Sequence, residues 1–256
     1  MSHNHFKEIL DNLAEKYNNK GFIAADPISI PHRFKKKEDI EISGFLAASI
    51  AWGNRRSIIK SAEKMMALMG NEPYRFVTEA KGKELKPLTN FVHRTFNSSD
   101  LLFFVESLKN IYQNYGGLEN VFTEGYHNKN NIIGAIQHFR LIFMKTEHEK
   151  RSEKHISDVS KNSAAKRINM YLRWMVRKDN KCVDFGLWQK IPMSELLIPL
   201  DVHCATTARR MGLLTRKQHD LKSVMEISEK LRLFRPYDPV YYDYALFGAG
   251  IGKDAI

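Results

Sequence analysis

Cysteine is scarce in this sequence of 256 residues, which contains only Cys182 and Cys204. Two thiols cannot form a disulfide framework, and one such chain cannot supply a four-cysteine zinc or iron–sulfur site. The first ten residues, MSHNHFKEIL, are polar and lack the apolar segment of a secretory signal peptide. Because reduced thiols without such a signal are typical of the cytosol, we expect a cytoplasmic protein with no metal and no cofactor.

Long apolar runs and alternating strand patterns are also absent. The longest apolar stretch, residues 42–52, is interrupted by serine and glycine and is too short to span a bilayer. No segment of strand length alternates apolar and polar residues, which predicts an all-α fold. The glycine-containing tail, residues 248–252, follows a predicted helix and precedes no βαβ unit, so it is not a dinucleotide-binding fingerprint.

Basic residues outnumber acidic ones, with 40 Lys and Arg against 29 Asp and Glu and a net charge of +11 at pH 7. Such a balance favours a polyanionic partner, either nucleic acid or an anionic membrane surface, and we favour nucleic acid. The densest basic cluster of the first half lies within residues 32–37. A run of this kind is a solvated loop or a phosphate contact, and charge alone does not distinguish DNA from RNA.

Apolar residues recur at helical spacing along most of the chain. Residues 145–163 are polar and predict an exposed connection between two helical lobes, and Asp238 is expected to cap the last helix. The predicted helices are Phe6–Tyr17, Asp39–Trp52, Arg55–Met69, Asp100–Tyr115, Leu118–Phe122, Asn131–Phe143, Ala164–Val176, Leu221–Leu233 and Pro239–Phe247.

The segment Ser194–Leu214, SELLIPLDVHCATTARRMGLL, carries the first candidate functional residue. An apolar run ends abruptly at Asp201, a helical pattern follows, and Gly212 stands where that helix would stop. Asp201 therefore occupies the position of an N-cap and Gly212 that of a C′ residue. A carboxylate behind an apolar approach segment is partly desolvated, which suits capping and also suits proton transfer or charge stabilisation.

The second candidate is Lys166, which follows the small polar run Asn162-Ser163-Ala164-Ala165 at the start of a predicted helix. Small residues before a helix leave its first N–H groups open to a phosphate. A lysine in that first turn would lie close to a bound nucleic-acid backbone, and its amine becomes a nucleophile when desolvated. Taken alone, Lys166 is better explained as one more exposed base on a basic helix, and Asp201 as a simple N-cap.

These two segments resemble the helix-hairpin-helix/GPD superfamily of DNA glycosylases, which includes endonuclease III and the 8-oxoguanine glycosylases. Leu-Asp-Val-His at residues 200–203, followed by Arg-Arg-x-Gly-Leu, resembles the segment that supplies the catalytic aspartate, and residues 162–169 fall on the hairpin that supplies the Schiff-base lysine. The stretches at residues 26–34, 41–54 and 172–177 resemble, more closely, an uncharacterised bacterial family of this superfamily.

The resemblance implies a single glycosylase-like unit over residues 1–256, built as two helical lobes flanking a groove for double-stranded DNA. Residues 1–40 with 160–256 would form one lobe and residues 41–159 the other. A damaged base would be flipped into the groove, Lys166 would attack the anomeric carbon, and Asp201 would activate the amine and stabilise the developing cation. A monomeric, nucleoid-associated base-excision repair enzyme with no iron–sulfur cluster is the expected protein.

The resemblance also implies which residues contact DNA. The hairpin would bind a phosphate through Asn162, Ser163 and Ala164, and nearby basic residues would contact the backbone: Arg167, Arg173, Arg177, His203, Arg209 and Arg210. A loop after the early buried helix would enter the duplex, and its residues here are Trp52, Asn54 and Arg55.

The chain departs from the superfamily pattern in two places. Asn162 and Ala164 replace the two hairpin glycines, and the 35-residue interval between Lys166 and Asp201 is longer than in most members. Asn tolerates the left-handed conformation, so the first replacement is mild, whereas the second crowds an approaching phosphate.

Three other functions therefore stay open. A scaffold that binds DNA or RNA without catalysis is one, and a purely protein-binding helical domain is another. Metal-dependent hydrolysis is the third, and would use Asp201 and His203 with one further histidine: His127, His138, His148 or His155.

Overall fold

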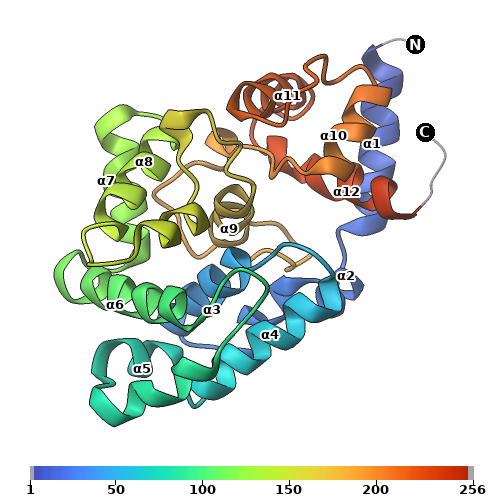
Figure 1. Cartoon of the computed structure of the whole chain (residues 1–256). Coiled ribbons are helices and arrows are strands. Elements are labelled where there is room, and N and C mark those ends of the chain that lie inside the picture. Colours follow the sequence, from blue (N-terminus) through green and yellow to red (C-terminus); the bar gives the residue numbers. More distant parts are fainter. Residues whose placement is uncertain (1–2, 253–256) are drawn as a thin grey trace. The chain divides into compact units, whose positions relative to one another are not determined.

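The computed structural model describes residues 3–252, and within them the protein is all-helical (Figure 1). These residues form twelve α-helices and seven 3₁₀ turns and contain no β-strand. The predicted all-α fold is therefore confirmed. No helix in the described range is long and apolar enough to cross a membrane.

The chain divides into two compact units, one comprising Met1–Phe22 with Asp158–Ile256 and the other Ile23–Ser157. The sequence prediction grouped residues 23–40 with the terminal segments, which is wrong. The 3₁₀ turns η1 (Pro27–Ser29) and η2 (Pro31–Arg33) pack against α3 (Lys37–Ser49) instead, and η1 also contacts α4 (Arg55–Leu68). These contacts place the whole segment in the second unit.

The core of the second unit is built around α3. Most of this helix is buried on every side, as expected for a helix that is apolar around its circumference. The ring of Phe45 packs at centroid distances of 5.7, 5.4 and 5.5 Å from the rings of Phe104, Phe139 and Phe143. These three rings come from α6 (Ser98–Asn114) and α8 (Ile132–Phe143). Helices α4 and α5 (Pro73–Glu79) also contact α3, and α7 (Leu118–Lys129) packs against α8.

Two segments of the second unit differ from the sequence prediction. The short helix α5, which spans about two turns after Pro73, is absent from the predicted helices. Residues 150–155 were expected to be exposed, yet the 3₁₀ turn η4 (Lys150–His155) buries two of its side chains. The Asp100 carboxylate of α6 accepts a hydrogen bond from the Ser152 hydroxyl at 2.5 Å and lies 3.3 Å from His155 Nε2. The contacts with Asp100, which is distant in sequence, therefore explain why Ser152 and His155 of this polar segment are buried.

The first unit contains α1 (His3–Tyr17), α9 (Lys166–Val176), α10 (Val202–Arg210), α11 (Leu221–Phe234) and α12 (Asp243–Gly252). The helix α2 (Lys20–Ala24) spans the division between the units in sequence. Figure 1 shows α12 beside α1 and α10, and α12 makes many contacts with both of these helices. A Cβ atom at Gly248 would lie 2.2 Å from Tyr17 Cδ2, so the glycine-containing tail allows close helix packing.

Replacing Gly248 with alanine should therefore destabilise the protein, although alanine favours helices. Overpacking of this kind lowers the free energy of unfolding by about 1–3 kcal/mol, which urea denaturation measures. The same substitution in a Tyr17→Ala background should have no such effect, because the ring that the new methyl group meets is gone. An equal loss of stability in both backgrounds would contradict this packing.

Candidate active site around Lys166 and Asp201

Asp201 is the N-cap of α10, as the sequence predicted. Its backbone is extended (φ −115°, ψ −176°), and its Oδ1 accepts a hydrogen bond from the backbone N–H of Cys204 at 2.8 Å. The apolar residues 196–200 that lead to it are buried. At the other end of α10, Gly212 has φ +68°, and Leu213 N–H donates to the Ala208 carbonyl at 2.8 Å. This is the Schellman arrangement in which glycine avoids left-handed strain.

The hairpin before α9 is formed with two left-handed residues. Asn162 has φ +63°, which agrees with the prediction that asparagine substitutes for the first glycine. The second left-handed residue is Ala165, with φ +47°, rather than Ala164. Alanine in this conformation carries a penalty of about 1 kcal/mol. Ala165 is the N-cap of α9, and alanine has no side-chain acceptor. Its side chain therefore accepts no hydrogen bond from the backbone N–H groups in the first turn of the helix.

An aspartate that sequence reasoning did not select fixes the hairpin. Asn162 Nδ2 donates to Asp220 Oδ2 at 3.0 Å, and the Leu221 N–H donates to the Asn162 carbonyl at the same distance. Asp220 also caps α11 and pairs with Arg216 at 2.5 Å. These partners, with the Arg216 bond the largest influence, hold the pKa of Asp220 well below its usual range. The N-cap position of Asp220 could be read from the sequence, but its contact with Asn162 could not.

The fold of the first unit brings the two candidate catalytic residues together. Lys166 Nζ lies 3.4 Å from Asp201 Oδ2. The Lys166 side chain is about one-third exposed (34%) and that of Asp201 15% exposed. The pair is therefore open to a ligand on one side and partly desolvated on the other. An amine and a carboxylate in this arrangement can exchange a proton and can stabilise a nearby developing cation.

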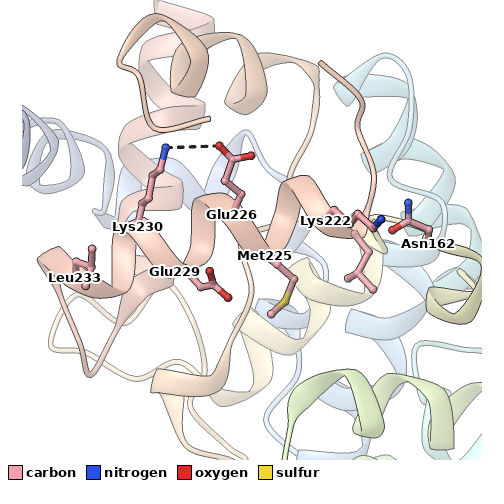
Figure 2. Close-up of a pocket in the computed structure, with 8 residues that line it drawn as sticks. Asn162, Lys222, Met225, Glu226, Glu229, Lys230 and Leu233 are labelled. Carbon is pink, nitrogen blue, oxygen red and sulfur yellow. Dashed lines mark ion pairs between the residues drawn. The ribbon is translucent and has the colours of Figure 1, made fainter. Parts of the chain in front are cut away.

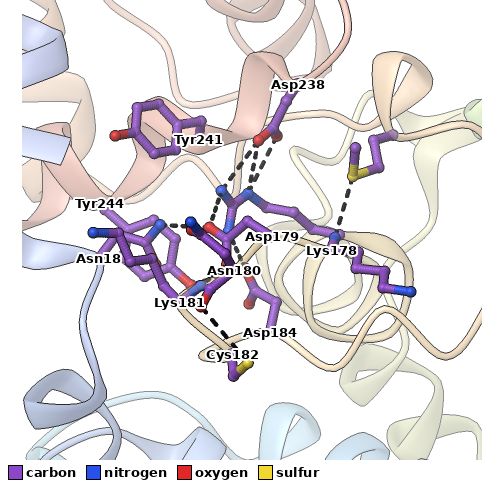
Figure 3. Close-up of polar contacts among 12 residues, drawn as sticks. Asn18, Lys178, Asp179, Asn180, Lys181, Cys182, Asp184, Asp238, Tyr241 and Tyr244 are labelled. Carbon is purple, nitrogen blue, oxygen red and sulfur yellow. Dashed lines mark hydrogen bonds and ion pairs between the residues drawn. The ribbon is translucent and has the colours of Figure 1, made fainter. Parts of the chain in front are cut away.

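The first unit also contains a buried network of ion pairs, part of which is drawn in Figure 3. Arg177 has no exposed side-chain surface and contacts Asp179 at 2.7 Å, Asp184 at 3.0 Å and Asp238 at 3.1 Å. Burial opposes its charge, but Asp184 and Asp238 more than compensate and raise the pKa of Arg177. Asp238 was expected to cap a helix and makes no such side-chain bond, because Arg177 holds it.

Arg173 belongs to the same network. Its side chain is 4% exposed and pairs with Asp243 and, at 3.2 Å, with Asp184. The prediction that Arg173 and Arg177 contact DNA phosphates is therefore wrong, since both guanidinium groups are buried in ion pairs. The basic, amphipathic pattern of α9 did not reveal that the side of the helix that carries the arginines is buried in the protein, as its apolar side is.

The remaining predicted basic residues have different environments. Arg209 donates to the backbone carbonyls of Arg216 and Lys217 at 2.8 and 2.9 Å, so it fixes the loop before α11. Arg167 is half-buried, and burial lowers its pKa to about 10. Arg210 and His203 are exposed. Of the set, Arg210 and His203 are thus the most accessible to a phosphate.

The predicted duplex-entering loop lies in the second unit. Asn54 caps α4 by accepting a hydrogen bond from the Ser57 N–H at 3.2 Å, and Arg55 is the first residue of that helix. Trp52 is half-exposed, and its ring lies 5.4 Å from that of His93 and 5.8 Å from that of His155. These contacts hold the indole in one orientation.

The alternative of metal-dependent hydrolysis gains no support from the geometry. Within residues 3–252 there is no group of three or more His, Cys, Asp or Glu side chains that could hold a metal ion. His155 lies against Asp100, as described above, and His148 stacks on Phe103 with ring centroids 4.4 Å apart. These two histidines therefore have structural contacts.

A groove of about 730 Å³ runs along the outer face of α11, next to the hairpin (Figure 2). It is lined by Asn162 and by residues of α11 that include Met225, Glu229 and Leu233. Lys230 and Glu226 form an ion pair at 3.5 Å along its wall. Neither Lys166 nor Asp201 lines this groove, so it is separate from the candidate site.

Over residues 3–252, the fold and site define an all-helical protein in which a hairpin precedes α9 and no side chain of the N-cap residue caps that helix. A lysine and an aspartate at the starts of α9 and α10 form an ion pair. The chain belongs to the family described as "Protein of unknown function (DUF2400)", whose model matches residues 26–252. No curated protein and no solved structure matches the chain.

Proposed function

We propose that this protein is a DNA glycosylase with an associated lyase activity that excises a damaged base from double-stranded DNA. The single observation that carries the proposal is the ion pair between Lys166 Nζ and Asp201 Oδ2 at 3.4 Å. These residues lie 35 positions apart and come from two different helix starts. The resemblance of both segments to the catalytic segments of the helix-hairpin-helix glycosylases links this geometry to that reaction.

In the proposed reaction, the flipped nucleotide places its anomeric carbon C1′ beside Lys166. The neutral amine forms a bond to C1′ as the N-glycosidic bond breaks. Asp201 accepts the proton that the amine releases and passes it to the departing base, and its negative charge stabilises the oxocarbenium-like transition state. Ring opening then breaks the C1′–O4′ bond and gives an imine between Lys166 and the sugar. β-Elimination removes a proton from C2′, breaks the C3′–O bond and nicks the strand.

Charge and backbone geometry support the DNA part of the proposal. The net charge of +11 favours a polyanion. The hairpin places the uncapped start of α9 one residue before Lys166, where a phosphate would accept hydrogen bonds from the N–H groups. The exposed Arg210 and His203 add positive or hydrogen-bonding groups on the neighbouring helix.

A second candidate function is nucleic-acid binding without catalysis on the same scaffold. The observation that favours it is the left-handed Ala165 with both hairpin glycines replaced. The two candidates differ in one respect: only the enzyme depends on Lys166 and Asp201. The non-catalytic protein would bind duplexes with strong salt dependence and release no base.

A panel of duplexes tests the proposal. Each duplex carries one modification, 8-oxoguanine, uracil, an oxidised pyrimidine or an abasic site, and a matched undamaged duplex is the control. We expect chromatography to detect a free base from at least one lesion and electrophoresis to detect strand cleavage at the abasic site. Salt-dependent binding to every duplex, with neither base release nor cleavage, would favour the non-catalytic candidate.

A further inference from the structure

The exposed face of α4 in the second unit carries a row of three cations. Arg56, Lys60 and Lys64 are exposed and lie four residues apart, so they form one ridge along the helix, with a rise of about 6 Å from each to the next. We call these three residues the α4 stripe. The opposite face of the helix is buried and apolar and consists of Ile58, Ala62, Met65 and Met66.

No carboxylate neutralises the α4 stripe. Glu63 is the one acidic residue of α4, and it pairs with Arg33 of the preceding 3₁₀ turn. Within residues 3–252 the stripe forms no ion pair, and Lys64 Nζ donates to the neutral carbonyl of Asn90 at 3.1 Å. Like charges four residues apart repel each other and destabilise a helix. The stripe therefore contributes nothing to the stability of α4, in contrast to α11, whose outer face carries lysines and glutamates together.

A neighbouring segment of the same unit adds a fourth cation, Arg94, at the start of α4. His93 Nδ1 lies 2.9 Å from the hydroxyl of Ser61 in the middle of α4. A Cβ atom at Gly53 would lie 2.6 Å from Arg94 Nη1, so the guanidinium group of Arg94 reaches the turn that precedes α4. Arg94 is exposed and forms no ion pair within the described residues.

The backbone of Arg94 is left-handed, with φ +54°. It lies in a tight turn closed by backbone hydrogen bonds between His93 and Phe96 at 2.8 and 2.9 Å. Glycine adopts this conformation without strain, whereas an arginine does not. Because the side chain is exposed, packing does not explain an arginine at this position. Strained backbone of this kind supports a functional role for the side chain.

We propose that the α4 stripe and Arg94 bind the phosphate backbone of double-stranded DNA. Duplex DNA carries one negative charge for about every 1.7 Å of its axis, which is dense enough to supply a phosphate to cations about 6 Å apart. Such contacts bind every base sequence alike and orient the duplex on the second unit. The choice of DNA among polyanions rests on the proposed function, whereas the charge and the geometry of the surface do not.

The test measures how salt weakens the binding of the whole protein to an undamaged duplex. Fluorescence anisotropy gives the binding constant at a series of salt concentrations, and each phosphate contact contributes about 0.9 to the slope of its logarithm against the logarithm of the salt concentration. The triple variant Arg56→Gln/Lys60→Gln/Lys64→Gln should therefore reduce this slope by about 2.7. Glutamine keeps most of the side-chain length and favours helices, so α4 should stay folded. An unchanged slope would overturn the proposal.

A matched control removes the same charge from another part of the second unit. Lys109→Gln/Lys129→Gln/Lys145→Gln changes three lysines that lie on α6, on α7 and just after α8 and that form no ion pair within the described residues. The slope should stay within about 0.5 of the wild-type value, because none of these lysines would contact a phosphate. A reduction as large as that of the stripe variant would mean that net charge alone drives binding, and would overturn the proposal.

Arg94→Gly separates a DNA contact from a structural role. Glycine adopts the left-handed conformation without penalty, so the free energy of unfolding should stay equal or rise. The slope should nevertheless fall by about 0.9, because one phosphate contact is lost. Lower stability with an unchanged slope would show that Arg94 serves the fold instead. This single variant also decides the test if the triple stripe variant does not fold.

Other polyanions are tested with the same variants. Duplex RNA of equal length and vesicles of phosphatidylcholine and phosphatidylserine replace the DNA, and weaker binding of the stripe variant to either of them, with an unchanged slope on DNA, would overturn the proposal. The undamaged duplex needs no catalysis, so the measurement separates this inference from the proposed function. A reduced slope in a protein that excises no base would retain the surface and reject the enzyme, whereas base excision with an unchanged slope would do the reverse.

Discussion

Lys166→Ala should abolish the covalent adduct that borohydride traps between this protein and a duplex containing an abasic site. The reason is chemical: only an amine can form the imine that borohydride reduces, and Lys166 Nζ is the amine that lies 3.4 Å from a carboxylate at the candidate site. Gel electrophoresis of the reduced mixture measures the adduct. We expect a loss of at least about a hundredfold, the size typical of removing a catalytic group.

Asp201→Asn is the matched variant for the carboxylate. Asparagine is as good an N-cap as aspartate, so α10 should keep its hydrogen bond to the Cys204 N–H and its stability. Base release should nevertheless fall by about 10²–10⁴-fold, because the charge and the proton acceptor are lost. Asp201→Ala should additionally lower the free energy of unfolding by about 1 kcal/mol through loss of the cap.

The combination of results distinguishes three proteins. An adduct in the wild type that is absent in Lys166→Ala identifies a bifunctional glycosylase. Base release without any adduct identifies a monofunctional enzyme, in which Lys166 serves as a phosphate contact. Unchanged activity in both variants would rule out this pair as the site of chemistry. The control for a general loss of positive charge is Arg210→Ala, which removes an exposed basic side chain from α10.

Arg177→Met should cause the largest loss of stability among single substitutions in the first unit. The arginine is fully buried, and its removal leaves three carboxylates near one another without their cation: Asp179, Asp184 and Asp238. Breaking a buried ion pair by removing one partner destabilises by about 3–5 kcal/mol, which is a large part of the 5–15 kcal/mol typical of a folded domain. Urea denaturation followed by circular dichroism measures this loss.

The pH dependence of this loss identifies its cause. Lowering the pH protonates carboxylates that have lost Arg177 in the variant and relieves their mutual repulsion, so the difference in stability between wild type and Arg177→Met should shrink between pH 7 and pH 4. Arg210→Met, on the exposed surface of α10, is the control and should change stability by no more than about 0.5 kcal/mol. A loss that is small, or independent of pH, would mean that the network does not stabilise the unit.

Local signals in the sequence were sufficient for most of the helices, but not for α2 and α5, and for one half of the candidate site. The N-cap at Asp201 and the C′ glycine at Gly212 were predicted correctly, because each depends on a hydrogen bond within a few residues. The left-handed conformation of Asn162 followed in the same way from the tolerance of asparagine for that region. Such features need no knowledge of the rest of the fold.

Contacts between distant segments were beyond that analysis. The basic residues of α9 were interpreted as a DNA-facing surface, yet Arg173 pairs with Asp243 and Arg177 with Asp238, 70 and 61 positions away. The pattern of arginines on an amphipathic helix does not reveal whether their partners are carboxylates of the same protein or phosphates of a ligand. Only the packing of α12 and its preceding turn against α9 decides which of the two occurs.

The sequence by itself thus determined an all-helical protein, the starts of its functional helices and the identity of the two groups that the proposed chemistry needs. The tertiary structure decided that these two groups meet and that Arg173 and Arg177 are buried in ion pairs. The physical reason is the separation along the chain over which each kind of interaction acts. Caps and helical periodicity act over a few residues, whereas ion pairing and burial depend on which helices pack together.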